Sequence, residues 1–322
     1  MFRSLALVAF AASLAAAPAV AQTKWDLPTG YPVSNFHTVN LQKFADAVKA
    51  GSGGKLEIVI HPNGSLYKAN EIKRAVQTGQ TPAGEVLMAN LGNENPMFEV
   101  DGVPFLATSY DAGRKLYAAQ KPYVEKILDG QGMKLLYAVA WPPQGIYSAK
   151  PVASVKDLEN APWRSYSPAT ARIGELLKAQ SVTVQAAELA QALSTGKVVA
   201  MMTSSATGVD SKVWEQVKFY YDTQAWLPKN MVIVSKAAFD KLDKATQDLV
   251  LAEAAKAEAA GWADSQKVAT DTKATLVQNG MTVQPPSAAL AEGLAAIGKT
   301  MTEEWEKKAG ADGAALLATF RK

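Results

Sequence analysis

The sequence predicts an α/β fold of two domains with mostly parallel sheets. Strand-like and helix-like segments alternate along most of the 322 residues, and this alternation is typical of parallel sheets covered by helices. A chain of this length can bury two hydrophobic cores. No tandem repeat or low-complexity linker separates the halves, so two domains joined by several crossing segments fit better than two domains in a row.

The alternating units follow one another along the chain. Residues 38–50 have apolar side chains at helical spacing, and residues 55–62 alternate as a strand that turns at the following Asn-Gly. Three later units each pair a helix with the strand after it. These units are 70–79 with 85–90, 121–132 with 133–141, and 187–196 with 197–205.

Residues 236–278 differ from the alternating units. This segment is rich in alanine, amphipathic and nearly without helix breakers, and only Gly261 interrupts it. Its length predicts one long helix or two helices in sequence. Such a helix would cover the surface of one domain or bridge both.

The N-terminal residues predict export. Arg3 precedes the apolar run LALVAFAASLAAA, and Ala19-Val20-Ala21 has the small residues of a signal-peptide cleavage site. We expect cleavage after about Ala21. No later stretch approaches the roughly 20 apolar residues of a membrane-spanning helix, so we expect a protein that is not embedded in a membrane. The absence of cysteine is compatible with an oxidising compartment.

Composition excludes several classes of function. Without cysteine there is no thiol catalysis, and His37 and His61 are the only histidines, so histidine triads and most metal sites lack their residues. Motifs for phosphate or dinucleotide binding are missing, so we expect no cofactor and no metal. A net charge of +3 without a dense basic run argues against nucleic acid. His61 ends a strand, whereas His37 lies in a loop that opens a helix.

Arg164 is the strongest candidate for binding. Residues 162–166 are expected to form a short strand, Ser167 is a good N-cap, and Pro168 suits the first helical position. Arg164 therefore lies at the carboxyl end of a strand, where α/β sheets bind ligands. A guanidinium presents two parallel donors that match a carboxylate. Arg172, eight residues later, is expected on the helix surface.

The order of five segments resembles a known family. The segments are KLEIVIHPNGSL, NEIKRAVQTG, VDGVPFL, KPVASVKDLENAPWR and VTVQAAELAQALSTGKVVAM. They resemble the solute-binding proteins of tripartite ATP-independent periplasmic (TRAP) transporters, the DctP-like group. In that family a strand-end arginine follows a run of Pro-(Ile/Val) and then Asp-Leu. In this chain the run is Pro151-Val152 and Asp157-Leu158, and the arginine is Arg164. The resemblance covers nearly all of the chain after the signal peptide.

The resemblance implies a periplasmic-binding-protein fold with a hinge, a cleft and a long helix spanning both domains. The expected domains are 22–147 with about 230–262, and 148–229 with about 263–322, after a signal peptide at 1–21. The protein would capture a small organic acid in the periplasm through Arg164. It would deliver that acid to a small and a large TRAP membrane subunit driven by an ion gradient.

Two departures from the family pattern bear on the ligand. Many members have a second arginine where this chain has Gln144, and Thr203 and Ser204 stand near a position that is often asparagine. With one cationic partner missing, a monocarboxylate is the better expectation. Dicarboxylate or sugar-acid binding by the same fold is an alternative.

Further cleft residues are expected at other strand ends and loops. Trp141 ends a strand, Tyr31 and Phe36 flank the first strand-to-helix loop, and Asn90 ends the strand at 85–90. Tyr166 follows Arg164 closely. Trp25, Trp163 and Trp226 are further candidates, although aromatic residues mostly fill cores. Aromatic walls around one arginine favour an aromatic or a 2-hydroxy or 2-oxo monocarboxylic acid.

Two other classes of function stay open at this stage. A secreted enzyme could use His37 as a base together with serine, aspartate or glutamate, and turnover of the ligand would distinguish it from a receptor. The chain could also serve a different importer or a sensor, for example an ATP-driven one. A purely structural role is disfavoured because it gives the arginine at the strand end no purpose.

Overall fold

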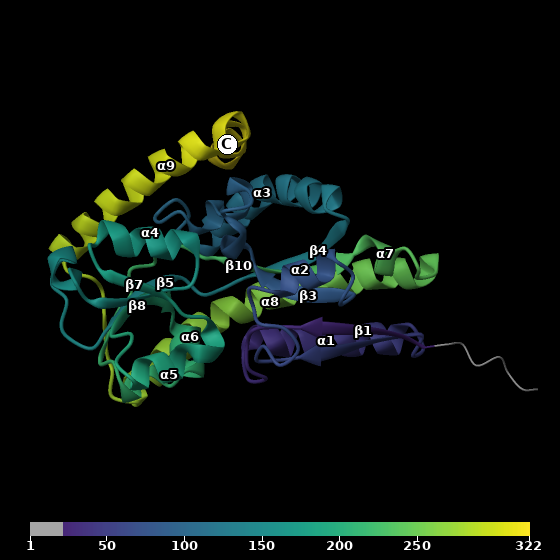
Figure 1. Ribbon diagram of the computed structural model, residues 1–322, viewed down its shortest axis with the longest axis horizontal. Coiled ribbons are helices and arrows are strands. Elements are labelled where there is room, and N and C mark those ends of the chain that lie inside the picture. The colour runs from purple at the N-terminus through teal and green to yellow at the C-terminus, as the bar shows by residue number, and fades with distance from the viewer. Residues whose placement is uncertain (1–21) are drawn as a thin grey trace, which may run out of the picture.

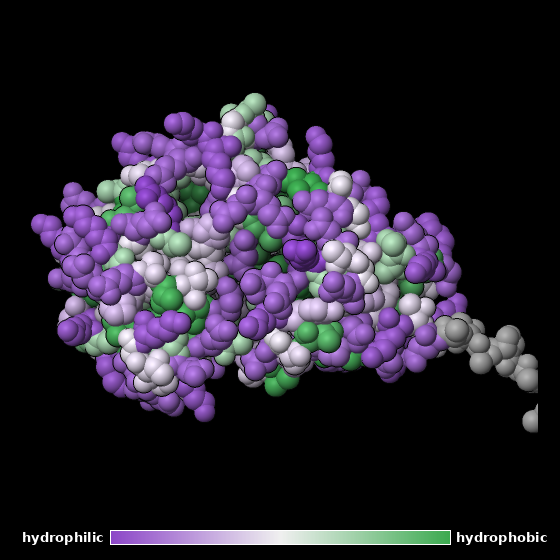
Figure 2. Space-filling view, viewed as in Figure 1, coloured by the Kyte–Doolittle hydropathy of each residue, from purple (hydrophilic) through white to green (hydrophobic). Residues whose placement is uncertain are grey.

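A computed structural model describes residues 22–322, which form two lobes arranged along the long axis of the molecule (Figure 1). The expected signal peptide lies outside the described residues. On the face in view, hydrophilic residues dominate and hydrophobic ones are scattered (Figure 2). Within residues 22–322, no helix has both the length and the apolar character needed to cross a membrane.

The first lobe contains two small sheets. In one, β1 and β2 pair in parallel; in the other, β10 lies between β3 and β4 and runs antiparallel to both. The strands are β1 (Thr23–Pro28), β2 (Leu56–His61), β3 (Ala83–Leu87), β4 (Met133–Ala140) and β10 (Lys229–Ser235). The helices of this lobe are α1 (Phe36–Gly51), α2 (Ile72–Gln77), α3 (Tyr110–Gly130) and α7 (Lys236–Phe239).

The second lobe is built on a six-stranded sheet in the order β11-β9-β5-β8-β6-β7. Only β5 runs against the others in this sheet, which confirms the prediction of mostly parallel strands. The strands are β5 (Gln144–Ser148), β6 (Pro162–Ser165), β7 (Gln180–Thr183), β8 (Ala200–Ser204), β9 (Phe219–Tyr221) and β11 (Thr282–Gln284). The helices are α4 (Pro168–Leu176), α5 (Leu189–Ser194) and α6 (Ser205–Asp210).

Short 3-10 helices connect several of these elements. They are η1 (Met88–Leu91), η2 (Pro96–Phe98), η3 (Val100–Gly102), η4 (Val155–Leu158), η5 (Ala186–Glu188) and η6 (Val213–Glu215).

Helix α8 (Lys244–Gln278) runs across both lobes, as predicted (Figure 1). It packs on α1 and β4 of the first lobe and on α6 and β11 of the second. Of the two possibilities left open for this segment, one long helix is the observed one from Lys244 on, because α8 continues through Gly261. A Cβ atom at Gly261 would lie 2.5 Å from Val139 Cγ2, so the glycine allows α8 to approach β4 closely.

Helix α9 (Ala288–Arg321), which the sequence analysis did not anticipate, also joins the lobes. At its start, Ser287 Oγ donates to the Ala153 carbonyl of the second lobe at 2.5 Å. Further along, Trp305 Nε1 donates to the Pro96 carbonyl of the first lobe at 2.8 Å. Arg172 on α4 forms two hydrogen bonds with Glu304 of α9 and stays partly exposed, in agreement with its expected surface position.

Two extended segments cross between the lobes beside each other, one from β4 to β5 and one from β9 to β10. The Trp141 amide donates to the Pro228 carbonyl at 2.8 Å, and the Gln144 amide donates to the Trp226 carbonyl at 3.0 Å. These hydrogen bonds satisfy the backbone where the chain leaves one sheet for the other. They also place the side chains of Trp141 and Gln144 at the junction of the lobes.

Candidate functional site

A cavity of about 440 Å³, including its opening to solvent, lies where the two lobes meet. Both lobes and both crossing segments contribute to the lining. The lining residues are Gly30, Tyr31, Ala69, Leu87, Trp141, Gln144, Arg164, Tyr166, Gln185, Ala186, Thr203, Ser204, Thr207 and Pro228.

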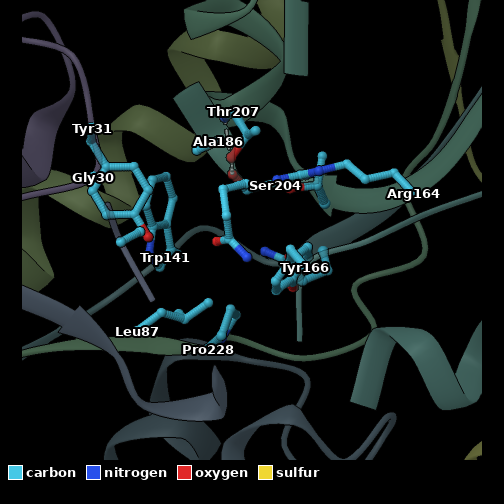
Figure 3. Close-up of a pocket in the computed structure, with 14 residues that line it drawn as sticks. Gly30, Tyr31, Leu87, Trp141, Arg164, Tyr166, Ala186, Ser204, Thr207 and Pro228 are labelled. Atoms are coloured by element: carbon cyan, nitrogen blue, oxygen red, sulfur yellow. Dashed lines mark hydrogen bonds between the residues drawn. The ribbon is translucent and has the colours of Figure 1, made fainter. Parts of the chain in front are cut away.

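Arg164 reaches toward the centre of this cavity from the side opposite Tyr31 and Trp141 (Figure 3). It lies in β6, between β7 and β8, and only 3% of its surface is exposed. Its Nε donates to the Val184 carbonyl at 2.9 Å, which fixes the plane of the guanidinium. Its Nη1 is buried and has no hydrogen-bond partner within the described chain.

The surroundings of Arg164 are suited to an anion. Burial lowers the pKa of the guanidinium to about 10, because the charged form loses its hydration. The Tyr166 ring lies 5.1 Å away, which provides a cation–π contact. A buried cation with an unused donor is costly by itself and is stabilised by an anion that accepts from it.

The local sequence builds this position as expected. Ser167 caps α4 by accepting from the Thr170 amide at 3.2 Å, and Pro168 occupies the first turn. The strand therefore ends at Ser165, one residue after Arg164, and the helix begins at Pro168. Because β6, β7 and β8 are parallel, the chain that follows each of them comes to the same edge of the sheet.

Gln144 lies within the cavity wall with its amide largely engaged. Its Oε1 accepts from the Tyr166 hydroxyl at 2.9 Å, and its Nε2 donates to the Pro142 carbonyl at 2.9 Å. Only 2% of its surface is exposed. These contacts hold the Gln144 amide in one orientation and leave a single N–H for a further partner.

The hydroxyl groups lie at the start of α6. Ser204 caps this helix by accepting from the Thr207 amide at 3.1 Å, and both residues line the cavity. The Thr203 hydroxyl also lines it and makes no hydrogen bond within residues 22–322. Ser205 instead accepts from Thr272 of α8 at 2.7 Å and contributes nothing to the lining.

Tyr31 and Trp141 form the aromatic wall facing Arg164. Their ring centroids are 4.9 Å apart in an edge-to-face arrangement. Trp141 Nε1 donates to Asn230 Oδ1 at 2.9 Å, which anchors the indole from behind. The first lobe thus offers a rigid, mostly apolar surface to a small ring.

The other predicted residues lie elsewhere. Phe36 packs edge-on against Trp141 at 5.3 Å, and Asn90 lies in η1 beyond the end of β3; neither is among the lining residues. Trp25, Trp163 and Trp226 belong to the hydrophobic core, since at most 2% of each is exposed.

His37 also lies in the interior. Only 1% of its surface is exposed, and burial lowers the pKa of its ring well below the usual value. The imidazole packs against Trp141 at 4.4 Å and does not line the cavity. His61 ends β2 as expected and contacts Asp26 at 2.7 Å.

Comparison with known proteins agrees with this arrangement. Residues 31–309 match the model of the DctP family, described as bacterial extracellular solute-binding protein, family 7. The chain belongs to this family. Its resemblance to TRAP solute-binding proteins is thereby confirmed, and the protein is a solute receptor rather than an enzyme.

Solved structures similar to this family 7 receptor include receptors that bind pyroglutamate. DctP6, an extracytoplasmic solute receptor of Bordetella pertussis that binds pyroglutamic acid, is 55% identical, covers 93% of this chain and 99% of its own, and superposes with a TM-score of 0.92. A marine metagenome TRAP protein in complex with co-purified pyroglutamate is 43% identical with the same coverage and TM-score.

A more distant relative supports the family assignment but says nothing about the ligand. A solute-binding protein of Albidiferax ferrireducens is 26% identical over 225 residues, which are 68% of this chain and 66% of that protein.

Seven lining residues of this family 7 receptor were not anticipated from the sequence. They are Gly30, Ala69, Leu87, Gln185, Ala186, Thr207 and Pro228. Gln185 and Ala186 follow Val184, which comes directly after β7, the neighbour of β6 in the sheet. The sequence indicated only that the segment VTVQ could end a strand; that this strand end lies beside Arg164 follows from the pairing of β7 with β6.

Proposed function

We propose that this receptor captures pyroglutamate, or a small monocarboxylate much like it, between its lobes. The observation that carries the proposal is the buried guanidinium of Arg164, whose Nη1 lacks a partner within residues 22–322 and lies beside the cavity between the lobes. The carboxylate of the ligand would accept from Arg164. Pyroglutamate binding by solved relatives that are 55% and 43% identical supports this choice of ligand.

The charge of the cavity favours one carboxylate over two. Arg164 is the only charged residue among those that line it. A dicarboxylate would therefore bury a second negative charge without a cation, which is unfavourable. Pyroglutamate is a monocarboxylate, as expected, but its ring is a lactam. The proposed class thus differs from the aromatic or 2-hydroxy or 2-oxo acids that the sequence favoured.

The same proposal includes the partners and the processing of the chain. We propose cleavage of the signal peptide after about Ala21, residence in the periplasm, and delivery of the ligand to the small and large TRAP membrane subunits. The two lobes would act as the domains of the receptor, dividing close to residues 147, 230 and 262. Closure of the lobes would bury the ligand, driven by its preference for the closed state.

Calorimetric titration of residues 22–322, freed of co-purified ligand by unfolding and refolding, tests the proposal. The panel is pyroglutamate, proline, glutamate, succinate, lactate, gluconate and benzoate. We expect pyroglutamate to bind most tightly and to be recovered unchanged. Preference for succinate, gluconate or benzoate would overturn the ligand class, and no binding to any acid would overturn the carboxylate receptor itself.

A further inference from the structure

Most polar groups that line the cavity already have partners within the protein. The Trp141 indole, the Gln144 amide, and the Ser204 and Tyr166 hydroxyls each form hydrogen bonds with other residues. Besides the second N–H of the Gln144 amide, three groups remain available among the lining residues. These are the Arg164 guanidinium apart from its Nε, the Thr203 hydroxyl and the Gln185 carboxamide, which forms no hydrogen bond within the described chain.

Gln185 is held in a fixed relation to Arg164. The residue before it, Val184, accepts from Arg164 Nε at 2.9 Å, and its own amide donates to the Ser165 carbonyl at 2.9 Å. The carbonyl that orients the guanidinium is thus one peptide bond from Gln185. Gln185 is half-buried and lines the cavity, so its side chain is within reach of a ligand whose carboxylate is bound by Arg164.

A carboxamide in this position matches a lactam. In a five-membered lactam the amide is cis, so the N–H and the C=O point to the same side. A carboxamide also presents its oxygen and one N–H on one side, so the two groups can exchange two hydrogen bonds. In pyroglutamate the ring nitrogen is bonded to the carbon that carries the carboxylate, which brings the lactam close to any residue adjacent to Arg164.

We infer that Gln185 recognises the lactam, its Oε1 accepting from the ring N–H and its Nε2 donating to the ring carbonyl. This inference rests on the proposed function. Gln144 is a poorer candidate because its Oε1 and one of its two Nε2 hydrogens are already engaged, which leaves only one N–H for a ligand. A single hydroxyl at Thr203 does not offer a donor and an acceptor side by side in this way. Gln185 would therefore determine why a lactam is preferred over other small carboxylates.

The test compares pyroglutamate with its lactone analogue, 5-oxotetrahydrofuran-2-carboxylate. The analogue keeps the carboxylate and the ring carbonyl but has oxygen in place of the N–H. The wild-type protein should bind pyroglutamate at least about tenfold more tightly, since the analogue leaves an acceptor unpaired. In Gln185→Met, which keeps the length of the side chain without its amide, this ratio should fall close to one.

Matched variants separate the possible outcomes. Gln180→Met, on the exposed end of β7, should keep the wild-type ratio, and thermal melts should show that Gln185→Met is folded. An unchanged ratio in Gln185→Met would overturn the inference while leaving the receptor assignment intact. The inference would also be overturned if the affinity ratio fell close to one in Gln144→Met but not in Gln185→Met. Failure of the wild-type protein to bind pyroglutamate would overturn the proposed function together with this inference.

Discussion

Asn35 and Asp210 join the two lobes directly. Asn35 Nδ2 donates to Asp210 Oδ2 at 2.6 Å, from the start of α1 in the first lobe to the end of α6 in the second. At the same time Asn35 Oδ1 caps α1 by accepting from the His37 amide at 2.9 Å. Asp210 lines a second, neighbouring cavity together with Tyr31 and Ala186, and these two residues also line the cavity described above. The contact therefore lies beside the cavity and holds the lobes together.

The first prediction concerns this contact. Asn35→Asp keeps an oxygen to cap α1 but places a carboxylate opposite Asp210. Repulsion should favour separation of the lobes and weaken pyroglutamate binding by about tenfold, the effect of roughly 1.4 kcal/mol. Calorimetry measures the affinity, and small-angle scattering should show a larger radius of gyration for the variant without ligand.

A reversed pair provides the control for the first prediction. In Asn35→Asp combined with Asp210→Asn, the amide and the carboxylate exchange places, so the hydrogen bond can form again in the opposite direction. Most of the lost affinity should return. If the double variant binds no better than Asn35→Asp alone, the contact does not contribute to closure.

The second prediction is a pH dependence of binding. Burial raises the pKa of Asp210 to about 6 from an ordinary 3.8. When the lobes separate, the carboxyl returns to water and its pKa falls toward the ordinary value, so closure takes up a proton below about pH 6. Lower pH therefore favours the closed, ligand-bound form. When the pH is lowered from 8 to 5.5, the affinity for pyroglutamate should rise about fourfold.

Asp210→Asn removes the titrating group and should give a flat profile over the same range. Glu85, whose pKa burial raises to about 7, would titrate nearby. It contacts Thr29 and His37 within the first lobe and should change little on closure. A slope that persists in Asp210→Asn would assign the pH dependence to another group.

The third prediction separates binding from stability at Arg164. Arg164→Met should reduce pyroglutamate affinity by at least 100-fold, since the carboxylate would be buried without its cation. The ligand-free variant should melt at the same temperature as the wild type or above it, because replacing an unpaired buried charge by an apolar chain removes its desolvation cost. Arg172→Met, with the same charge change on α4, should bind normally. A variant of Arg164 that is strongly destabilised without ligand would indicate a structural role instead.

Local sequence patterns were sufficient to predict those features of the fold that depend only on neighbouring residues. The strand end at Arg164, the Ser167 cap and the Pro168 start of α4 follow one another within five residues, so propensity and capping rules predict them. The long helix α8 was likewise predictable from its alanine content and lack of breakers. Each of these features depends on neighbours in the sequence.

Other features depend on partners far away in the sequence. Gln185 reaches the cavity because β7 pairs with β6, and no pattern in the sequence states the order of strands. The strand that was expected to end at Asn90 ends at Leu87, and a 3-10 turn moves Asn90 past the cavity. Phe36 begins α1 and packs behind Trp141. Tertiary packing, rather than local preference, decided these positions.

The last prediction concerns the packing of α8. Gly261→Ala should lower the free energy of unfolding by about 1–3 kcal/mol, because its Cβ would overlap Val139 on β4 and crowd the Asn40 amide. Asn40 Nδ2 donates to the Ala257 carbonyl at 2.9 Å, so α1 cannot move aside without losing that bond. Gly130 lies at the end of α3, and a Cβ atom added there would have no neighbouring atom within 4 Å. Gly130→Ala should therefore leave stability unchanged or raise it by about 0.5 kcal/mol. Chemical denaturation of both variants measures the difference, and equal stabilities would show that α8 does not require the close approach at Gly261.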